Sequence, residues 1–176
     1  MHFQDLSLCE YHPGFLDAGS WSVPLRAAGW LEHPHAFPKA KAPAGFISRL
    51  RTLLQLTQES LPHYQFRGVH ECSVCVAEGN EPPSSPGWSQ GNLLIPGDGE
   101  IFAAPGGVVH YVEDHRYAPP NRFVSAVLGC PDIGTDEYFT ELRRVNLGQT
   151  IPLQSKTEFD AMFRRQIEAT LKKREP

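Results

Sequence analysis

Long apolar runs, abundant cysteines and a strong net charge are all missing from this sequence. None of its 176 residues fall in an apolar run of about 18 residues, so no transmembrane helix is expected. The first residues, MHFQDLSLCEYHPG, lack the basic start and the long apolar stretch of a secretory signal. Four cysteines are too few for a disulfide framework in a chain of this size. Together these absences predict a cytoplasmic globular protein.

The excess of acidic over basic residues is small, with a net charge of -4 and a pI of about 6.0. A chain-wide field of that sign does not attract nucleic acid, although a local basic patch still can. The sequence contains no GxGxxG or Walker motif, which removes the common nucleotide-binding signatures. An apolar fraction of 40% remains ample for one buried core.

Apolar periodicity and turn residues predict an α+β fold, with a small antiparallel sheet packed by several helices around a zinc-finger-like site. An amphipathic helix is expected over 43–56, opened by Pro43. The PGDG turn within 91–105 predicts two short strands. Shorter helices are expected over 108–115, 121–128 and 136–145.

The chain divides into a domain over 1–150 and an amphipathic helix within 151–176. Ser155 and Glu158 fit a capping box at the start of that helix. Its basic residues offer a nucleic-acid-binding surface as one alternative function. Interleaved acidic residues and the lack of an aromatic platform favour a solvated helix face instead. The basic residues are Arg164, Arg165, Lys172, Lys173 and Arg174.

The clearest chemical motif is a CxxC pair followed by two histidines. Cys72 and Cys75 have the spacing of a zinc knuckle, in which a tight turn directs both thiolates at one ion. His110 and His115 follow with HxxxxH spacing, within the range of Cys2His2 sites. Residues five apart on an ideal helix point about 140° away from each other, so the last turn must tighten or unwind. His70 is therefore the alternative fourth ligand, since it shares a face with Cys72 in a strand.

Two other interpretations of the cysteine pair stay open, a redox pair and two buried thiols without metal. The redox interpretation is disfavoured because no clear helix follows Ser73–Val74, and a helix N-terminus is what lowers a thiolate pKa in redox motifs. Zinc remains the preferred cofactor.

Several blocks in order resemble an uncharacterised bacterial family, a domain of unknown function, from about residue 5 to residue 145. The blocks include GWLEHPHAFP (29–38), RGVHECSVC (67–75) and GEIFAAPGGVVHYVEDHRYAPPNRFVSAVL (99–128). Members share a GWL…HxFP segment, an RGxHxCxxC segment and an AP…HY…HxYxPP…F…AV segment. The resemblance implies no reaction. It does imply that the shared pattern includes His70, Cys72, Cys75, His110, His115, Tyr117, Pro119 and Pro120.

The first functional hypothesis is a small zinc-stabilised protein that binds a protein partner, in an accessory or, by analogy, immunity-like role. The alternative is a zinc-dependent hydrolase or nuclease with three ligands, Cys72, Cys75 and His110, and an open position for water. Its general base would come from Glu71, Glu113 or Asp114. A structural zinc site needs only metal ligands, without an open position or a general base. A loop-rich protein also gains folding free energy from such a closed site.

Overall fold

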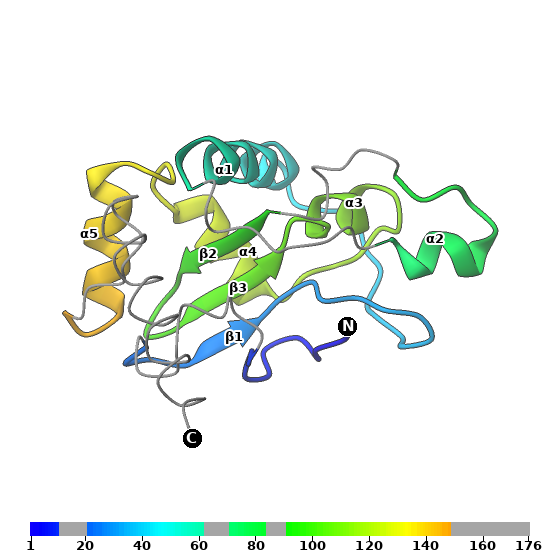
Figure 1. Cartoon of the computed structure of the whole chain (residues 1–176), viewed down its shortest axis with the longest axis horizontal. Coiled ribbons are helices and arrows are strands. Elements are labelled where there is room, and N and C mark those ends of the chain that lie inside the picture. The colour runs from blue at the N-terminus through cyan, green and yellow to red at the C-terminus, as the bar shows by residue number, and fades with distance from the viewer. Residues whose placement is uncertain (11–20, 62–70, 84–90, 149–176) are drawn as a thin grey trace, which may run out of the picture.

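The structure, a computed structural model, describes residues 1–10, 21–61, 71–83 and 91–148 (Figure 1). It is an α+β fold with one small sheet, which confirms the predicted class. None of the helices in these ranges is long and apolar enough to span a membrane. In chain order the elements are β1 (Leu25–Ala27), α1 (Phe46–Ser60), α2 (Ser73–Glu78), β2 (Asn92–Pro96), β3 (Ile101–Pro105), α3 (Val108–Glu113), α4 (Asn121–Gly129) and α5 (Asp136–Val145).

The sheet has the order β1-β3-β2 and is mixed rather than wholly antiparallel. β2 and β3 pair antiparallel, with Ile95 opposite Phe102, because the short PGDG turn between them permits only a hairpin. β1 runs parallel to β3, with Leu25 opposite Ile101. The expectation of an antiparallel sheet is therefore correct for the hairpin and wrong for β1. A parallel pair needs a long connection, and the whole of α1 and α2 lies between these two strands.

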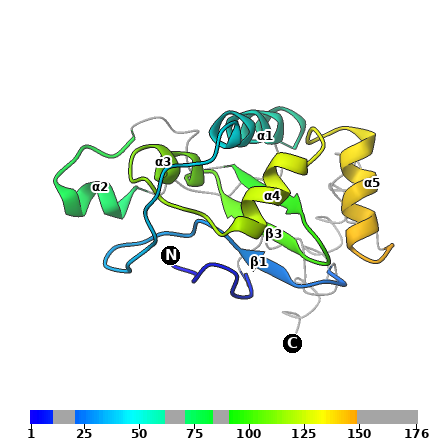
Figure 2. The ribbon, with the colours of Figure 1, turned by 180° about the vertical axis from the view of Figure 1, so that it is seen from behind.

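The core lies between the sheet and the helices α1 and α4. Figure 2 shows α4 crossing the sheet, with α1 beside it and α5 at one end. Phe123 of α4 meets Phe46 of α1 and Phe102 of β3 edge to face, with ring centroids 6.3 and 5.6 Å apart. Such aromatic pairs add stability beyond the area that they bury. This packing holds β3 in place, and the chain passes from β3 directly into α3.

The predicted helices are present with small shifts at their ends. α1 begins three residues later than expected, because Gly45 adopts a left-handed conformation with φ 77° before it. α5 spans the predicted residues, and its N-cap Thr135 accepts a hydrogen bond from the amide of Tyr138. α3 ends at Glu113, two residues before the predicted end. The C-terminal helix predicted within 151–176 lies outside the described residues, so that division of the chain stays a prediction.

Candidate metal centre

The CxxC pair lies at the start of α2. Cys72 is the N-cap residue, and its Sγ accepts a hydrogen bond from the amide of Cys75 at 3.4 Å. The expectation that no helix follows Ser73–Val74 is wrong, since α2 begins at Ser73. A helix of six residues is too short to show an apolar period in the sequence. The turn buries both side chains, which are 0% and 4% exposed.

The two histidines reach the same place because α3 ends between them. His110 lies inside α3, whereas His115 follows its C-cap, Asp114. Arg116 then adopts φ 57°, which turns the chain away from the helix axis. The 140° separation of an ideal helix therefore does not apply to this pair. The two imidazole rings lie edge to face, with centroids 4.8 Å apart.

The four side chains form one compact cluster. Their ligand atoms all lie within 4.8 Å of one another. His115 Nε2 is 3.3 Å from the Sγ of both Cys72 and Cys75, and 3.1 Å from His110 Nε2. A tetrahedral zinc with ordinary bond lengths would place its sulfur and nitrogen ligands about 3.6 Å apart and its two nitrogens about 3.3 Å apart. The spacing fits a single small metal ion at the centre.

A carboxylate lies beside the outer nitrogen of each histidine. Asp114 Oδ2 is 2.6 Å from Nδ1 of His110, and Glu78 Oε2 is 3.2 Å from Nδ1 of His115. The Asp114 contact is a hydrogen bond, which holds the ring proton of His110 on Nδ1 and leaves its Nε2 lone pair for a metal. The Glu78 contact is an ion-pair distance only, since Nδ1 of His115 has no hydrogen-bond partner among the described residues. The sequence did not single out either residue for this role. Asp114 was recognisable, because it stands four residues after His110 on one helical face.

Without a metal, the four side chains of the cluster shift one another's pKa values in opposite directions. Burial alone would raise the pKa of Cys72, but the His110 imidazole and the Cys75 amide lower it. The pKa of His110 is raised by the neighbouring Cys72 and Asp114 against the opposing effect of burial. Burial, with the Cys72 thiolate, raises the pKa of Cys75 to about 11, and burial with the His110 charge lowers that of His115. A metal ion replaces these protons, because thiolate and neutral imidazole are the binding forms.

The other residues proposed from the sequence are engaged elsewhere or lie outside the described ranges. Glu113 forms an ion pair with Arg51 at 2.6 Å, and Asp114 contacts His110. Glu71 is exposed. His70, the alternative fourth ligand, lies outside the described residues, as do the basic residues of the C-terminal segment. Among the described residues, His115 is the histidine whose Nε2 lies 3.3 Å from both thiols.

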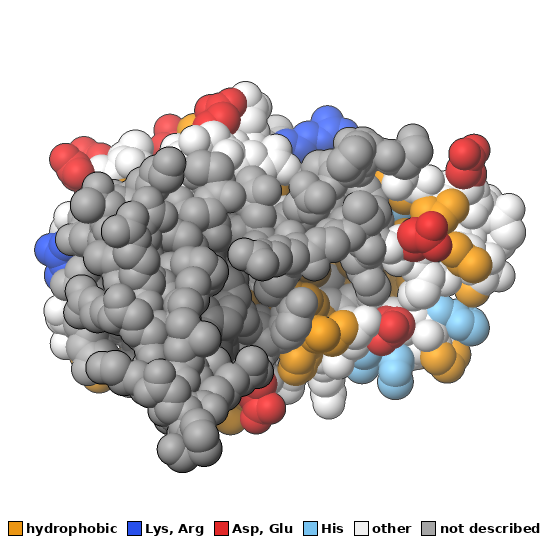
Figure 3. All heavy atoms as spheres, in the orientation of Figure 1, with side chains coloured by type: hydrophobic (Ala, Val, Ile, Leu, Met, Phe, Trp, Pro, Cys, Tyr) orange, Lys and Arg blue, Asp and Glu red, His pale blue; other side chains and the backbone are white. Residues whose placement is uncertain are grey.

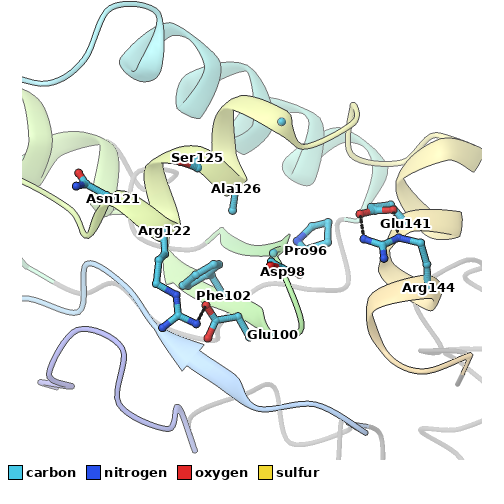
Figure 4. Close-up of a pocket in the computed structure, with 12 residues that line it drawn as sticks. Pro96, Asp98, Glu100, Phe102, Asn121, Arg122, Ser125, Ala126, Glu141 and Arg144 are labelled. Carbon is cyan, nitrogen blue, oxygen red and sulfur yellow. Dashed lines mark hydrogen bonds and ion pairs between the residues drawn. The ribbon is translucent and has the colours of Figure 1, made fainter.

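A cavity of about 570 Å³ lies away from the cluster, between the β2–β3 turn, α4 and α5. Figure 4 shows that its two arginines are already paired, Arg122 with Glu100 and Arg144 with Glu141. Glu100 is buried, and its other oxygen lies 3.5 Å from Nε of Arg26. These ion pairs engage both arginines and both glutamates of the lining, to which Asp98 also belongs.

A family model described as a domain of unknown function, DUF7919, matches residues 1–128. The matched range contains all four residues of the cluster and every element from β1 to α3. No curated protein and no solved structure matches the chain.

Proposed function

The chain belongs to the DUF7919 family of uncharacterised domains, and we propose that the cysteine–histidine cluster of this protein is a closed structural zinc centre. Cys72, Cys75, His110 and His115 would bind one Zn²⁺, and the domain would serve as a non-enzymatic binding module. The observation that carries the proposal is the convergence of these four buried donors within 4.8 Å.

The donor set favours zinc over other common cations. Two thiolates and two imidazoles are soft and borderline ligands, which suit Zn²⁺ and exclude Mg²⁺ and Ca²⁺ as preferred occupants. Zinc also accepts the tetrahedral arrangement without electronic strain. The chemistry supplied by the ion here is structural, since it joins two segments of chain at one point.

Four protein ligands leave no coordination position for a water molecule. The hydrolase alternative needs His115 to stay unbound, yet this side chain is buried at 4% exposure and contacts both thiols. The acid beside the cluster, Asp114, is occupied as a partner of His110. A closed site therefore agrees better with the geometry than a catalytic one.

The metal would anchor α2, a segment with little packing of its own. Of the six residues of α2, only Val74 and Cys75 are buried. Two buried side chains supply too little apolar contact to hold a short helix in place. Two thiolate–metal bonds would fix it to α3. Figure 1 shows α2 at one extreme end of the molecule, joined to the body beside α3.

We extend the proposal to a protein partner that docks on this metal-held end, in an accessory role of which an immunity protein is one analogue. Val76 of α2 exposes 55% of its surface although it is apolar. Exposed carboxylates of Glu71 and Glu81 flank it along the chain. An apolar side chain framed by acids suits a partner with a basic rim around an apolar pocket.

Metal analysis of the full chain, purified without added zinc, tests the structural site. We expect one zinc per chain by elemental analysis, and two sulfur and two nitrogen ligands by X-ray absorption. Cys72→Ser should lose the metal, whereas Cys130→Ser should keep it, because Cys130 lies outside the cluster. A zinc with an oxygen ligand would favour the hydrolase, and a chain without metal would overturn the proposal.

A further inference from the structure

A second cavity, of about 480 Å³, lies beside the N-terminal segment and has no part in the metal centre. Three stretches line it: residues 2–5, the loop 31–38 that follows β1, and Ala118 with Pro120 after α3. The last two belong to the GWLEHPHAFP and HRYAPP blocks, of which the metal cluster uses only His115. Figure 3 shows histidine and hydrophobic side chains gathered together at this end of the molecule.

Asp5 is the ionisable acid of this cavity, and one of its oxygens is held from inside the protein. Its Oδ1 accepts hydrogen bonds from the Tyr117 hydroxyl at 2.7 Å and from the Gly29 amide at 3.0 Å. Its Oδ2 accepts none from the described part of the chain. The two bonds orient the carboxylate and leave one oxygen for a ligand, as preorganised sites do. They also explain why Tyr117 is fully buried.

His2 and His35 line the same cavity as Asp5. His2 Nδ1 lies 3.1 Å from the carbonyl oxygen of Trp30. Because a carbonyl only accepts, Nδ1 donates this hydrogen bond. His35 stacks on His2 with ring centroids 3.8 Å apart. The cavity thus places a stacked pair of imidazole rings in the same lining as the Asp5 carboxylate.

The remaining lining is aromatic and aliphatic. Phe3 and Phe37 border the cavity together with Leu31, Pro38 and Pro120. No lysine or arginine occurs among the described residues that line it, in contrast to the larger cavity, where Arg122 and Arg144 pair with Glu100 and Glu141. An unpaired carboxylate oxygen among aromatic rings attracts a cation rather than an anion.

We propose that this cavity binds a small primary amine with an apolar body, whose ammonium group is held by Oδ2 of Asp5 beside the imidazole of His2. Phe3, Phe37 and the prolines receive the apolar part. The proposal rests on the cavity and not on the zinc centre, although His115 and Tyr117 lie on one short stretch of chain. It predicts selectivity for a positive charge and for an apolar body in the same ligand.

Titration of the full chain with benzylamine, followed by amide NMR shifts, tests this assignment. We expect saturable shifts at the lining residues with a Kd of about 1 mM, in keeping with a ligand of this size. Benzyl alcohol, which has the same shape without the charge, should bind about tenfold more weakly or worse. Benzoate should give no saturable shift.

Two variants separate the site from general charge and from misfolding. Asp5→Asn keeps an oxygen for the Tyr117 and Gly29 hydrogen bonds and removes only the charge, and we expect a loss of about tenfold or more in benzylamine affinity. Asp98→Asn, in the larger cavity, changes the net charge equally and should bind as the unaltered chain does. Equal affinity in Asp5→Asn, or no saturable shift at the lining residues, would overturn the proposal. Zinc content should stay the same throughout.

Discussion

At the scale of single residues, each histidine of the metal cluster lies between the thiols and a carboxylate. Nε2 faces the thiols, while Nδ1 faces a carboxylate of Asp114 or Glu78. The hydrogen bond to Asp114 fixes the ring orientation and the tautomer of His110 before a metal arrives, whereas Nδ1 of His115 has only a close contact with Glu78. Asp114 is 65% exposed and Glu78 is 43% exposed, so the two acids are accessible to substitution without repacking the core.

Removal of these carboxylates should weaken zinc binding while leaving the fold intact. We expect Asp114→Ala to lower zinc affinity by roughly 10- to 100-fold, because it frees the His110 imidazole to rotate. Glu78→Ala should lower the affinity less, since Glu78 lies close to His115 without a hydrogen bond to it. Competition with a chromophoric chelator measures the change. Glu113→Ala is the matched control, since this neighbour pairs only with Arg51 in the described chain and should leave the affinity unchanged. Equal losses in all three variants would show that general surface charge is responsible.

At the scale of elements, the chain that leaves β1 lies directly against the start of α3. Gly29 has φ 72°, and a Cβ added there would come within 2.5 Å of Cγ2 of Val108. Val108 is the first residue of α3, the helix that carries His110. The close approach therefore sets the position of α3 relative to the sheet.

Two glycines with similar backbone angles separate strain from packing. Gly45, with φ 77°, has no atom within 4 Å of an added Cβ. We expect Gly45→Ala to cost about 1 kcal/mol, the strain of the left-handed conformation alone. Gly29→Ala should cost about 1–3 kcal/mol more, because Val108 must also move. Urea unfolding of both variants gives the difference, and equal losses would mean that the contact with Val108 relaxes freely.

At the scale of the whole molecule, the zinc centre would couple one extreme end of the fold to the core. A ligand that binds only the folded chain stabilises it by about 2.7 kcal/mol at a concentration 100 times its Kd. The cluster joins α2 to α3, and α3 packs against α1. Stability gained at the metal should therefore appear in the unfolding of the entire domain.

Chelation should lower the melting temperature of the full chain. We expect a decrease of roughly 5–11 °C with EDTA, recovered on addition of zinc, from the stabilisation above and the size of the protein. Differential scanning calorimetry measures this shift. The Cys72→Ser variant should melt at the same temperature with and without EDTA. An unaltered melting temperature in the original chain would show that the metal contributes nothing to folding.

The sequence by itself determined the features that depend on neighbouring residues. The PGDG turn predicted the hairpin of β2 and β3, because a short turn leaves no other pairing. Asp136–Val145 was predicted to its ends, since apolar period and cap lie within one stretch. The CxxC and HxxxxH spacings predicted the four members of a cluster that could hold a metal, because ligands near in sequence need little help to meet.

Only the tertiary structure decided the features that join distant segments. The parallel pairing of β1 with β3, the short helix α2 and the contact of Asp5 with Tyr117 left no local pattern to find. The meeting of His115 with the two thiols also depended on where α3 ends and on the turn at Arg116. Local propensity acts over a few residues, whereas these contacts form only when the core has brought the segments together.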